Sequence, residues 1–226
     1  MEQRVLSVEG FNSFLSKVFM WMFIGLLTTA FTAFIVASTP ALYYLIRSNQ
    51  ILFFGLIIGE FALVITLSRN ALKYSYQKTV GLFLLYSFVN GLTLSIYLLS
   101  YSGTSIASAF VITAAMFGVM ALYGYVAKTD LSGFGTFAMF GIVGIIIATI
   151  VNIFLASGTL SYIISLAGVV LFAGLTAYDM QKMKSIYAYS EQQGGRMEGN
   201  LAVTGALRLY LDFINMFLFV LRLGRK

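Results

Sequence analysis

Residues 134–156 read FGTFAMFGIVGIIIATIVNIFLA, a stretch without one charged side chain. A helix needs about 20 apolar residues to cross the hydrocarbon core of a bilayer. The strands of a membrane barrel are shorter and alternate polar with apolar residues over about ten positions. The stretch therefore predicts a transmembrane helix.

The rest of the chain has the same character. Of its 226 residues, 60% are hydrophobic and 10% are charged, and the mean hydropathy is +0.92. Soluble domains are about half apolar and about a quarter charged, so most of this chain requires lipid as its solvent. The net charge of +6 is then read as an orientation signal rather than as a nucleic-acid footprint, and no nucleic-acid partner is expected.

Apolar windows long enough to span a membrane occur seven times, with short polar breaks between them. They cover residues 14–38, 51–68, 79–100, 104–126, 134–156, 159–180 and 201–223. No break is long enough for a soluble domain. We therefore predict an all-α membrane protein with seven transmembrane helices, in which residues 1–226 form a single polytopic domain.

The basic residues predict that the N-terminus is cytoplasmic. With that orientation the inner segments hold Arg4, Lys17, Arg69, Lys73, Lys78, Lys128, Lys182, Lys184 and Arg196. The outer loops hold only Arg47, but seven spans also place Arg222, Arg225 and Lys226 outside, against the positive-inside rule. Either the early helices dictate a seven-span topology, which we favour, or the last segment re-enters and its tail returns to the cytoplasm.

Several classes of chemistry are excluded by residues that the chain lacks. It has no histidine and no cysteine, which removes catalytic triads, thiolate nucleophiles and the usual zinc ligands. It also has no glycine-rich phosphate-binding loop of either common pattern. We expect no enzymatic activity and no cofactor, and any response to pH must come from carboxyl or lysine groups.

Three acidic residues fall inside predicted spans: Glu60, Asp179 and Asp212. A charged side chain in a span costs a few kcal/mol on insertion scales, so such residues usually face a cavity or a partner. The alternative is a structural carboxyl that a neighbouring helix satisfies, and it carries more weight for Glu60 than for the two aspartates.

The last span carries a polar stripe. Thr204, Arg208, Asp212 and Asn215 recur at intervals of four, four and three residues, which places them on one helix face. A helix with such a face would not be surrounded by lipid. The stripe therefore predicts that the last helix lies at the centre of the bundle.

The depth of each acid decides whether Asp179 and Asp212 can meet. If the last span begins at Leu201, Asp212 lies about 16 Å deep, too far from Asp179. If Arg208 marks the cytoplasmic interface instead, Asp212 lies about 6 Å deep, within reach of Asp179 when Lys182 extends to the interface. We adopt the second register.

Two carboxyl groups within hydrogen-bond reach in a low-dielectric site share one proton, because both cannot ionise cheaply. Asp179 and Asp212 would thus form a pH sensor that needs no histidine. When ionised, the pair would attract a cation, which Arg69, Arg208 or the solution could supply.

A hard ion such as Ca²⁺ suits the oxygen ligands that this chain offers. Asp179 and Asp212 are its candidate ligands, and the amides of Asn90, Asn152 and Asn215 are candidates for an ion pathway. Neutral amides inside spans also serve as interhelical hydrogen-bonding groups, and that alternative stays open.

Three segments resemble the Bax inhibitor family, in particular its bacterial members. They are GLTAYDMQK at residues 174–182, LRLYLDFIN at residues 207–215 and KTDLSGF at residues 128–134. The resemblance runs from the first span to the end of the chain. It implies seven helices with the last one wrapped by the other six, and a pH-sensitive Ca²⁺ leak in the inner membrane.

The resemblance also implies roles for individual residues. Asp179 and Asp212 match the sensing pair of the family. Arg69 is the candidate for an arginine that latches this pair, although the local sequence leaves its register open. Glu60 matches a glutamate of the family's ion pathway.

Two functions of other classes remain as alternatives. Some bacterial relatives lack the acidic pair and are associated with regulating membrane proteolysis, so this chain could be a non-transporting regulator of a protease or another membrane partner. An intramembrane aspartyl protease would use Tyr178-Asp179, but its second motif requires Gly-x-Gly-Asp. The bulky Leu209-Tyr-Leu-Asp212 departs from that motif.

Overall fold

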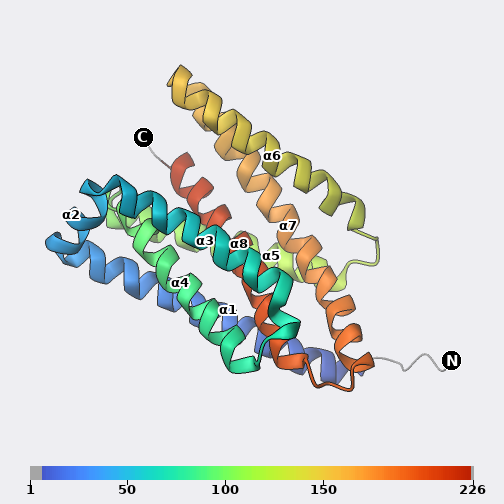
Figure 1. Cartoon of the computed structure of the whole chain (residues 1–226). Coiled ribbons are helices and arrows are strands. Elements are labelled where there is room, and N and C mark those ends of the chain that lie inside the picture. Colours follow the sequence, from blue (N-terminus) through green and yellow to red (C-terminus); the bar gives the residue numbers. More distant parts are fainter. Residues whose placement is uncertain (1–6, 225–226) are drawn as a thin grey trace. The chain divides into compact units, whose positions relative to one another are not determined.

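A computed structural model describes residues 7–224 of the chain. In chain order it contains α1 (Val8–Ser38), α2 (Pro40–Ser48), α3 (Gln50–Asn70), the 3₁₀ turn η1 (Ala71–Lys73), α4 (Tyr76–Leu98), α5 (Gly103–Val126), α6 (Ser132–Leu155), α7 (Gly158–Gln192) and α8 (Glu198–Leu223) (Figure 1). Arg4, Arg225 and Lys226, which entered the orientation argument, lie outside the described residues.

Seven of these helices, all except α2, are long and apolar enough to cross a membrane. This confirms the predicted all-α class with seven candidate spans. The last span is one continuous helix of 26 residues, without the reversal that a re-entrant segment requires.

Four helices end at a different residue from the predicted span. The second span was drawn to Ser68, whereas α3 continues to Asn70. The third span was drawn to Ser100 and the fifth to Ala156, whereas the helices end at Leu98 and Leu155. Ala156 adopts a left-handed conformation with φ 48°, which closes its helix. The sixth span was drawn to Met180, but α7 continues to Gln192 because a helix need not end where its apolar run ends.

The short helix α2 was not predicted, because Pro40 was read only as a break between spans. Proline occupies the first turn of α2, where the missing backbone N–H has no helical partner in any case. The residue therefore ends one helix and begins the next.

The polar breaks between spans act as helix caps. Side-chain oxygens of the residue before a helix accept a hydrogen bond from a backbone N–H of the first turn, which otherwise lacks a partner. This arrangement is present at Ser7, Asn49, Ser75 and Ser102, which cap α1, α3, α4 and α5. Each of these polar residues thus satisfies one backbone N–H at the start of its helix.

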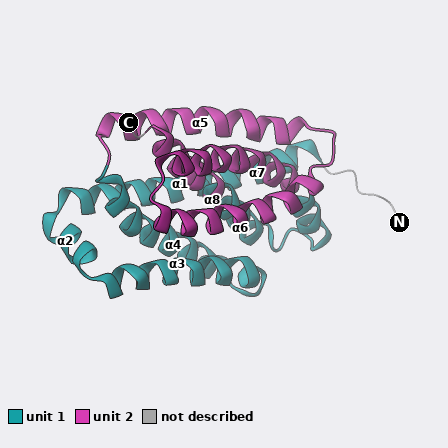
Figure 2. Ribbon diagram, turned by 90° about the horizontal axis from the view of Figure 1, so that it is seen from above, with its two compact units in different colours: residues 1–100, 184–210 teal, residues 101–183, 211–226 magenta. Residues whose placement is uncertain are grey.

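The chain divides into two compact units, shown in Figure 2. Unit 1 comprises residues 1–100 and 184–210, and unit 2 comprises residues 101–183 and 211–226. The division falls within two helices. Consequently α7 and α8 each contribute their first part to one unit and their second part to the other.

In unit 1, α4 packs against both α1 and α3. The approach to α1 is close at Gly91, where an added Cβ would lie 2.7 Å from the carbonyl oxygen of Thr29 and 2.6 Å from Cβ of Thr32. Small residues at such positions let membrane helices pack backbone to backbone. The ring of Tyr210 on α8 packs against the ring of Tyr86 on α4, with the two centroids 5.7 Å apart.

In unit 2, α7 makes the corresponding close contacts. A Cβ at Gly124 of α5 would overlap the carbonyl oxygen of Ala177, and one at Gly168 of α7 would lie 2.5 Å from the ring of Phe219 in α8. Phe219 also stacks on Phe172, with centroids 5.9 Å apart. These contacts set the register of α7 against α5 and α8.

Burial varies strongly among the spans. The apolar window of α8 is 67% buried and that of α7 is 50% buried, whereas those of α3 and α6 are each 6% buried. Helices that are apolar and exposed are suited to contact with lipid. We therefore look for the functional site on α7 and α8.

Candidate functional site

Both predicted sensing acids are buried in unit 2. Asp179 of α7 is 7% exposed and Asp212 of α8 is 4% exposed. Acidic residues are almost never this buried unless other groups compensate them, and both side chains do interact with other groups of the protein. Lipid exposure of either acid is thereby excluded.

The stacked pair Phe172 and Phe219 relates the heights of the two acids. Asp179 follows Phe172 by seven residues along α7, and Asp212 precedes Phe219 by seven residues along α8. Consecutive spans run in opposite directions. Both acids therefore lie on the same side of the phenylalanine pair, each about 10 Å from its own phenylalanine along the helix axis. Seven residues are also nearly two helical turns, so each acid lies on the same face as its phenylalanine.

The shallow placement of Asp212 that the sequence argument adopted requires such a matched level, and the depth of either acid in the membrane stays a prediction. The deeper placement would have separated the two acids by several turns. The direct contact between Asp179 and Asp212 stays a prediction, and their matched level is the observation that supports it.

Gln181, two residues after Asp179, joins α7 to the loop between α5 and α6 by hydrogen bonds. Its Oε1 accepts a hydrogen bond from the backbone N–H of Leu131 at 2.9 Å, and its Nε2 donates to the carbonyl oxygen of Thr129 at 2.8 Å. Two of the three segments that carry the family resemblance are thus bonded to each other. The sequence argument did not foresee this contact, because glutamine was not weighed as a site residue.

The same loop contains Asp130, which lies outside the spans. Its carboxylate accepts a hydrogen bond from the backbone N–H of Ser132 at 2.9 Å. Side-chain and backbone hydrogen bonds from Ser132 hold the pKa of Asp130 below its ordinary value. Asp130 therefore stays ionised under mildly acidic conditions.

The predicted charge partners Arg69 and Arg208 belong to unit 1, whereas the acids belong to unit 2. Arg69 is exposed in the last turn of α3. Arg208 is half-buried on α8 and interacts with other groups of the protein. A latch formed by either arginine stays a prediction.

Two of the predicted pathway amides bond locally. Asn152 donates to Oγ of Ser161 at 2.7 Å and accepts from the backbone N–H of Ser157 at 3.1 Å, which closes the turn between α6 and α7. Asn215 donates to the carbonyl oxygen of Leu211 in its own helix at 2.8 Å. These bonds give both amides a structural role, and their place in an ion pathway stays a prediction.

The remaining pathway candidates, Glu60 and Asn90, come together in unit 1. Oε2 of Glu60 accepts a hydrogen bond from Nδ2 of Asn90 at 3.2 Å, and Oε1 accepts one from Thr93. The sequence argument named Glu60 and Asn90 separately and missed Thr93. Its position three residues after Asn90, on the same face of α4, was the available signal.

The polar cluster around Glu60 continues into the buried interior of unit 1. The hydroxyl of Tyr210 donates to Oδ1 of Asn90 at 2.9 Å and lies 2.6 Å from Oγ1 of Thr29. Thr29 in turn donates to the carbonyl oxygen of Ser87 at 2.9 Å. The contacts therefore link α3, α4, α8 and α1.

Polar contacts that the sequence did not reveal hold the start of α8 to other elements of unit 1. Nδ2 of Asn200 donates to the carbonyl oxygens of Ala71 at 2.6 Å and Tyr74 at 2.8 Å. Glu198 pairs with Lys17 at 2.8 Å. These contacts attach α8 to the η1 turn and to α1.

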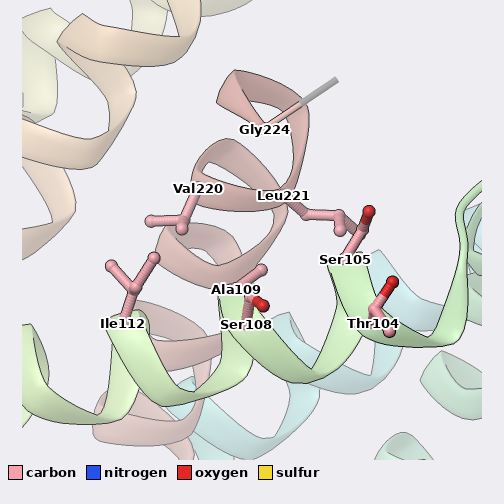
Figure 3. Close-up of a pocket in the computed structure, with 8 residues that line it drawn as sticks. All are labelled: Thr104, Ser105, Ser108, Ala109, Ile112, Val220, Leu221 and Gly224. Carbon is pink, nitrogen blue, oxygen red and sulfur yellow. The ribbon is translucent and has the colours of Figure 1, made fainter. Parts of the chain in front are cut away.

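A cavity of about 270 Å³ lies in unit 2 between the first turns of α5 and the last turns of α8 (Figure 3). Figure 3 shows the hydroxyl groups of Thr104, Ser105 and Ser108 along its α5 side. The other lining residues are Ala109, Ile112, Val220, Leu221 and Gly224. A cavity of this size with three hydroxyl groups can hold water.

Within residues 7–224 no group of three or more acidic side chains lies close enough to hold a metal ion. Ca²⁺ takes six to eight oxygen ligands in its protein sites. Asp179 and Asp212 as contacts of Ca²⁺ stay a prediction.

Known proteins of similar sequence place these observations in a family. The family model described as inhibitor of apoptosis-promoting Bax1 matches residues 11–225. The inner membrane protein YbhL of Escherichia coli strain K12 is 46% identical over 217 residues, which cover 95% of this chain and 92% of that protein.

Two further relatives extend the likeness to other bacteria. An uncharacterized protein of Borreliella burgdorferi is 42% identical over 95% of this chain and 93% of its own length. Another, from Rickettsia prowazekii, is 38% identical over 96% and 92%. Seven apolar helices and a match along nearly the whole chain lead to one conclusion: this membrane protein belongs to the Bax inhibitor family.

Proposed function

We propose that the protein is a pH-sensitive cation leak channel, with Ca²⁺ as its cargo, and that it has no enzymatic activity. One observation carries the proposal: two buried acids, Asp179 and Asp212, lie at matched levels on α7 and α8. The name of the relative from Escherichia coli supports an inner-membrane location. The distribution of basic residues supports a cytoplasmic N-terminus.

The gating step follows from the electrostatics of the pair. With one shared proton, the carboxyl groups of Asp179 and Asp212 hydrogen-bond to each other and hold α7 against α8. With the proton lost, two negative charges repel each other and attract a cation. Deprotonation therefore opens the contact and creates the charge that draws Ca²⁺ into it.

We place α8 at the centre of the bundle, wrapped by the other six spans. Its high burial and its polar stripe support this placement. Within the stripe Thr204, Arg208 and Asn215 are half-buried, whereas Asp212 is buried. A face that is polar and incompletely packed is suited to line a path for a hydrated ion.

Arginine is the proposed latch of the closed state. Arg69 or Arg208 would pair with an ionised carboxylate and compete with the cation for it. Removal of the latch should therefore raise the resting leak, because the carboxylate is then available to the cation. Arg69→Ala tests this directly, and unchanged flux would direct attention to Arg208.

Reconstituted liposomes provide the decisive experiment. Ca²⁺ flux is measured against pH with an encapsulated indicator for the parent protein and for Asp212→Asn. We expect parental flux to rise as the pair ionises and the variant to lose this pH dependence. A variant that follows the parental profile would refute gating by the pair. A series of other cations then identifies the selectivity.

A non-transporting regulator of a protease or another membrane protein is the alternative. The exposed apolar faces of α3 and α6 favour it to the extent that they offer surface to a helical partner as well as to lipid. The liposome assay separates the two functions, because a regulator should pass no Ca²⁺ at any pH.

A further inference from the structure

A continuous chain of polar contacts begins at Glu60 and ends at the carbonyl oxygen of Ser87. Glu60 contacts the Asn90 amide at 3.2 Å, and this amide contacts the Tyr210 hydroxyl at 2.9 Å. Tyr210 lies 2.6 Å from the hydroxyl of Thr29, which lies 2.9 Å from Ser87 O. All five residues belong to unit 1, and Thr29, Ser87 and Tyr210 are fully or almost fully buried.

The number of protons in this chain depends on the orientation of the Asn90 amide. When its oxygen faces Tyr210, both ends of the inner segment, Asn90 Oδ1 and Ser87 O, are acceptors. Three contacts then connect them through two hydroxyl groups, which supply one proton each. One of the three contacts must lack a proton.

The opposite amide orientation supplies the missing proton. Nδ2 of Asn90 then donates to Tyr210, Tyr210 donates to Thr29, and Thr29 donates to Ser87 O. The amide oxygen now faces Oε2 of Glu60, so two acceptors would meet unless the carboxyl group is protonated. A protonated Glu60 donates to Asn90 and completes every contact of the chain.

We propose that Glu60 is a proton-binding site whose occupancy sets the direction of the hydrogen-bond chain through Asn90, Tyr210 and Thr29. Uptake of one proton from water forms the O–H bond of the Glu60 carboxyl. The amide turns over and the phenol redirects its proton from Asn90 to Thr29, while Thr29 keeps its hydrogen bond to Ser87 O. No other covalent bond forms or breaks.

Among the residues of this hydrogen-bond chain, Glu60 is the group that titrates. The phenols of Tyr86 on α4 and Tyr210 on α8 interact electrostatically with it. Phenols ordinarily ionise at about pH 10, so both remain neutral in the cell. The basic groups on the neighbouring elements are Arg47 on α2, Arg69 at the end of α3, Lys73 in η1, Lys78 in the first turn of α4 and Arg208 on α8.

A proton bound at Glu60 on α3 therefore changes the hydrogen bonds between residues buried in unit 1. In the ionised state Tyr210 donates to Asn90 and Thr29 donates to Ser87 O, so the contact between Tyr210 of α8 and Thr29 of α1 lacks a proton. The protonated state has a hydrogen bond there. Glu60 would thus adjust the attachment of α1 to α8. This site is independent of the Asp179–Asp212 pair and does not require that any cation passes.

Infrared difference spectroscopy of the protein in lipid vesicles tests the site without measuring flux. Acidification should produce a protonated-carboxyl band that Glu60→Gln removes. Glu60→Asp should shift the position of this band, and it serves as the second variant if the glutamine protein does not fold. A band that survives unchanged in either variant would overturn the assignment to Glu60.

The chain itself is tested at its far end. Thr29→Val removes one hydroxyl, after which the protonated and ionised states have equal numbers of completed contacts. The Glu60 titration midpoint should therefore fall by about 0.5 to 1 pH unit, the equivalent of one net hydrogen bond. Tyr210→Phe should give the same shift.

Thr32→Val is the matched control. Thr32 is buried on the same helix, but its hydroxyl donates to Thr28 O of that helix and lies outside the chain. We expect the parental midpoint in this variant. A midpoint that Thr29→Val leaves unchanged would overturn the hydrogen-bond chain. Absence of Ca²⁺ flux with an intact Glu60 titration would refute only the leak.

Discussion

Unit 1 and unit 2 both carry carboxyl groups within membrane-spanning helices, but they surround these groups differently. Glu60 of unit 1 lies half-buried on the peripheral helix α3 and accepts hydrogen bonds from Asn90 and Thr93. Asp179 and Asp212 of unit 2 are buried on the two most buried spans. A lone acid can be satisfied by neutral donors, whereas two acids at one level must share a proton or separate.

The largest expected effect comes from the acid pair. Asp179→Asn, Asp212→Asn and the double variant should each lose nearly all of the pH-dependent part of the Ca²⁺ flux, because two coupled groups titrate as one unit. Flux against pH in liposomes measures this. If the effects of the two single variants simply add in the double variant, the acids act separately and the contrast with Glu60 disappears.

Packing in unit 2 provides the next test, because the level of the two acids depends on it. Gly124→Ala places a methyl group against the Ala177 backbone, which cannot move aside as a side chain can. We expect a loss of about 1–3 kcal/mol in the free energy of unfolding. Gly118→Ala, on the same helix with nothing within 4 Å, is the control and should be neutral or stabilising by up to about 1 kcal/mol, because alanine favours the helix more than glycine does.

The next prediction concerns unit 1 and tests whether Glu60 depends on its hydrogen-bond donors. Thr93→Val removes one of the two donors with little change in shape. It should cost about 1–3 kcal/mol of stability, measured by denaturant titration in detergent. Thr149→Val is the control, because Thr149 donates only to Ile145 O of its own helix. Equal losses in the two variants would show that Glu60 does not depend on Thr93.

A smaller effect is expected at the Lys17–Glu198 pair. The side chains are 48% and 24% exposed, so water screens their attraction. Lys17→Ala should lower stability by at most about 1 kcal/mol, less at high salt. A larger loss would mean that this pair, rather than the contacts of Asn200, holds the start of α8.

The smallest effect is expected at Asp130, an acid outside the spans. Its pKa is lowered in the folded state, so its contribution to stability is present above its ordinary pKa and is lost only as the pH falls through the lowered value. Asp130→Asn should therefore leave the midpoint of Ca²⁺ flux against pH unchanged. A shifted midpoint would assign the loop between α5 and α6 to the sensor.

Much of the fold could be predicted because lipid imposes strong rules on sequence. Seven apolar windows of sufficient length predicted seven spans, and the helices confirm them. The exceptions are local. Pro40 was read as a break although proline also begins helices, and α7 continues for 12 residues beyond Met180 because polar residues do not by themselves end a helix.

The site was predictable in its residue types but not in its pairings. Glu60 and the two aspartates were identified as costly intramembrane acids, and this needed no knowledge of neighbours. Glu60 bonds directly to Asn90 and Thr93 of α4, and the contacts continue from Asn90 to Tyr210 of α8 and then to Thr29 of α1. Helical periodicity relates residues within one helix and carries no information about which helices adjoin.

The sequence by itself determined that most of this protein lies in lipid, how many spans it has and which acids could respond to pH. Each of these follows from the free energy of placing side chains in hydrocarbon. Only the tertiary structure decided that Asp179 and Asp212 lie at matched levels and that Glu60 joins a chain of hydroxyl and amide groups. Those facts depend on the register between helices, which side-chain packing sets over distances that no local pattern spans.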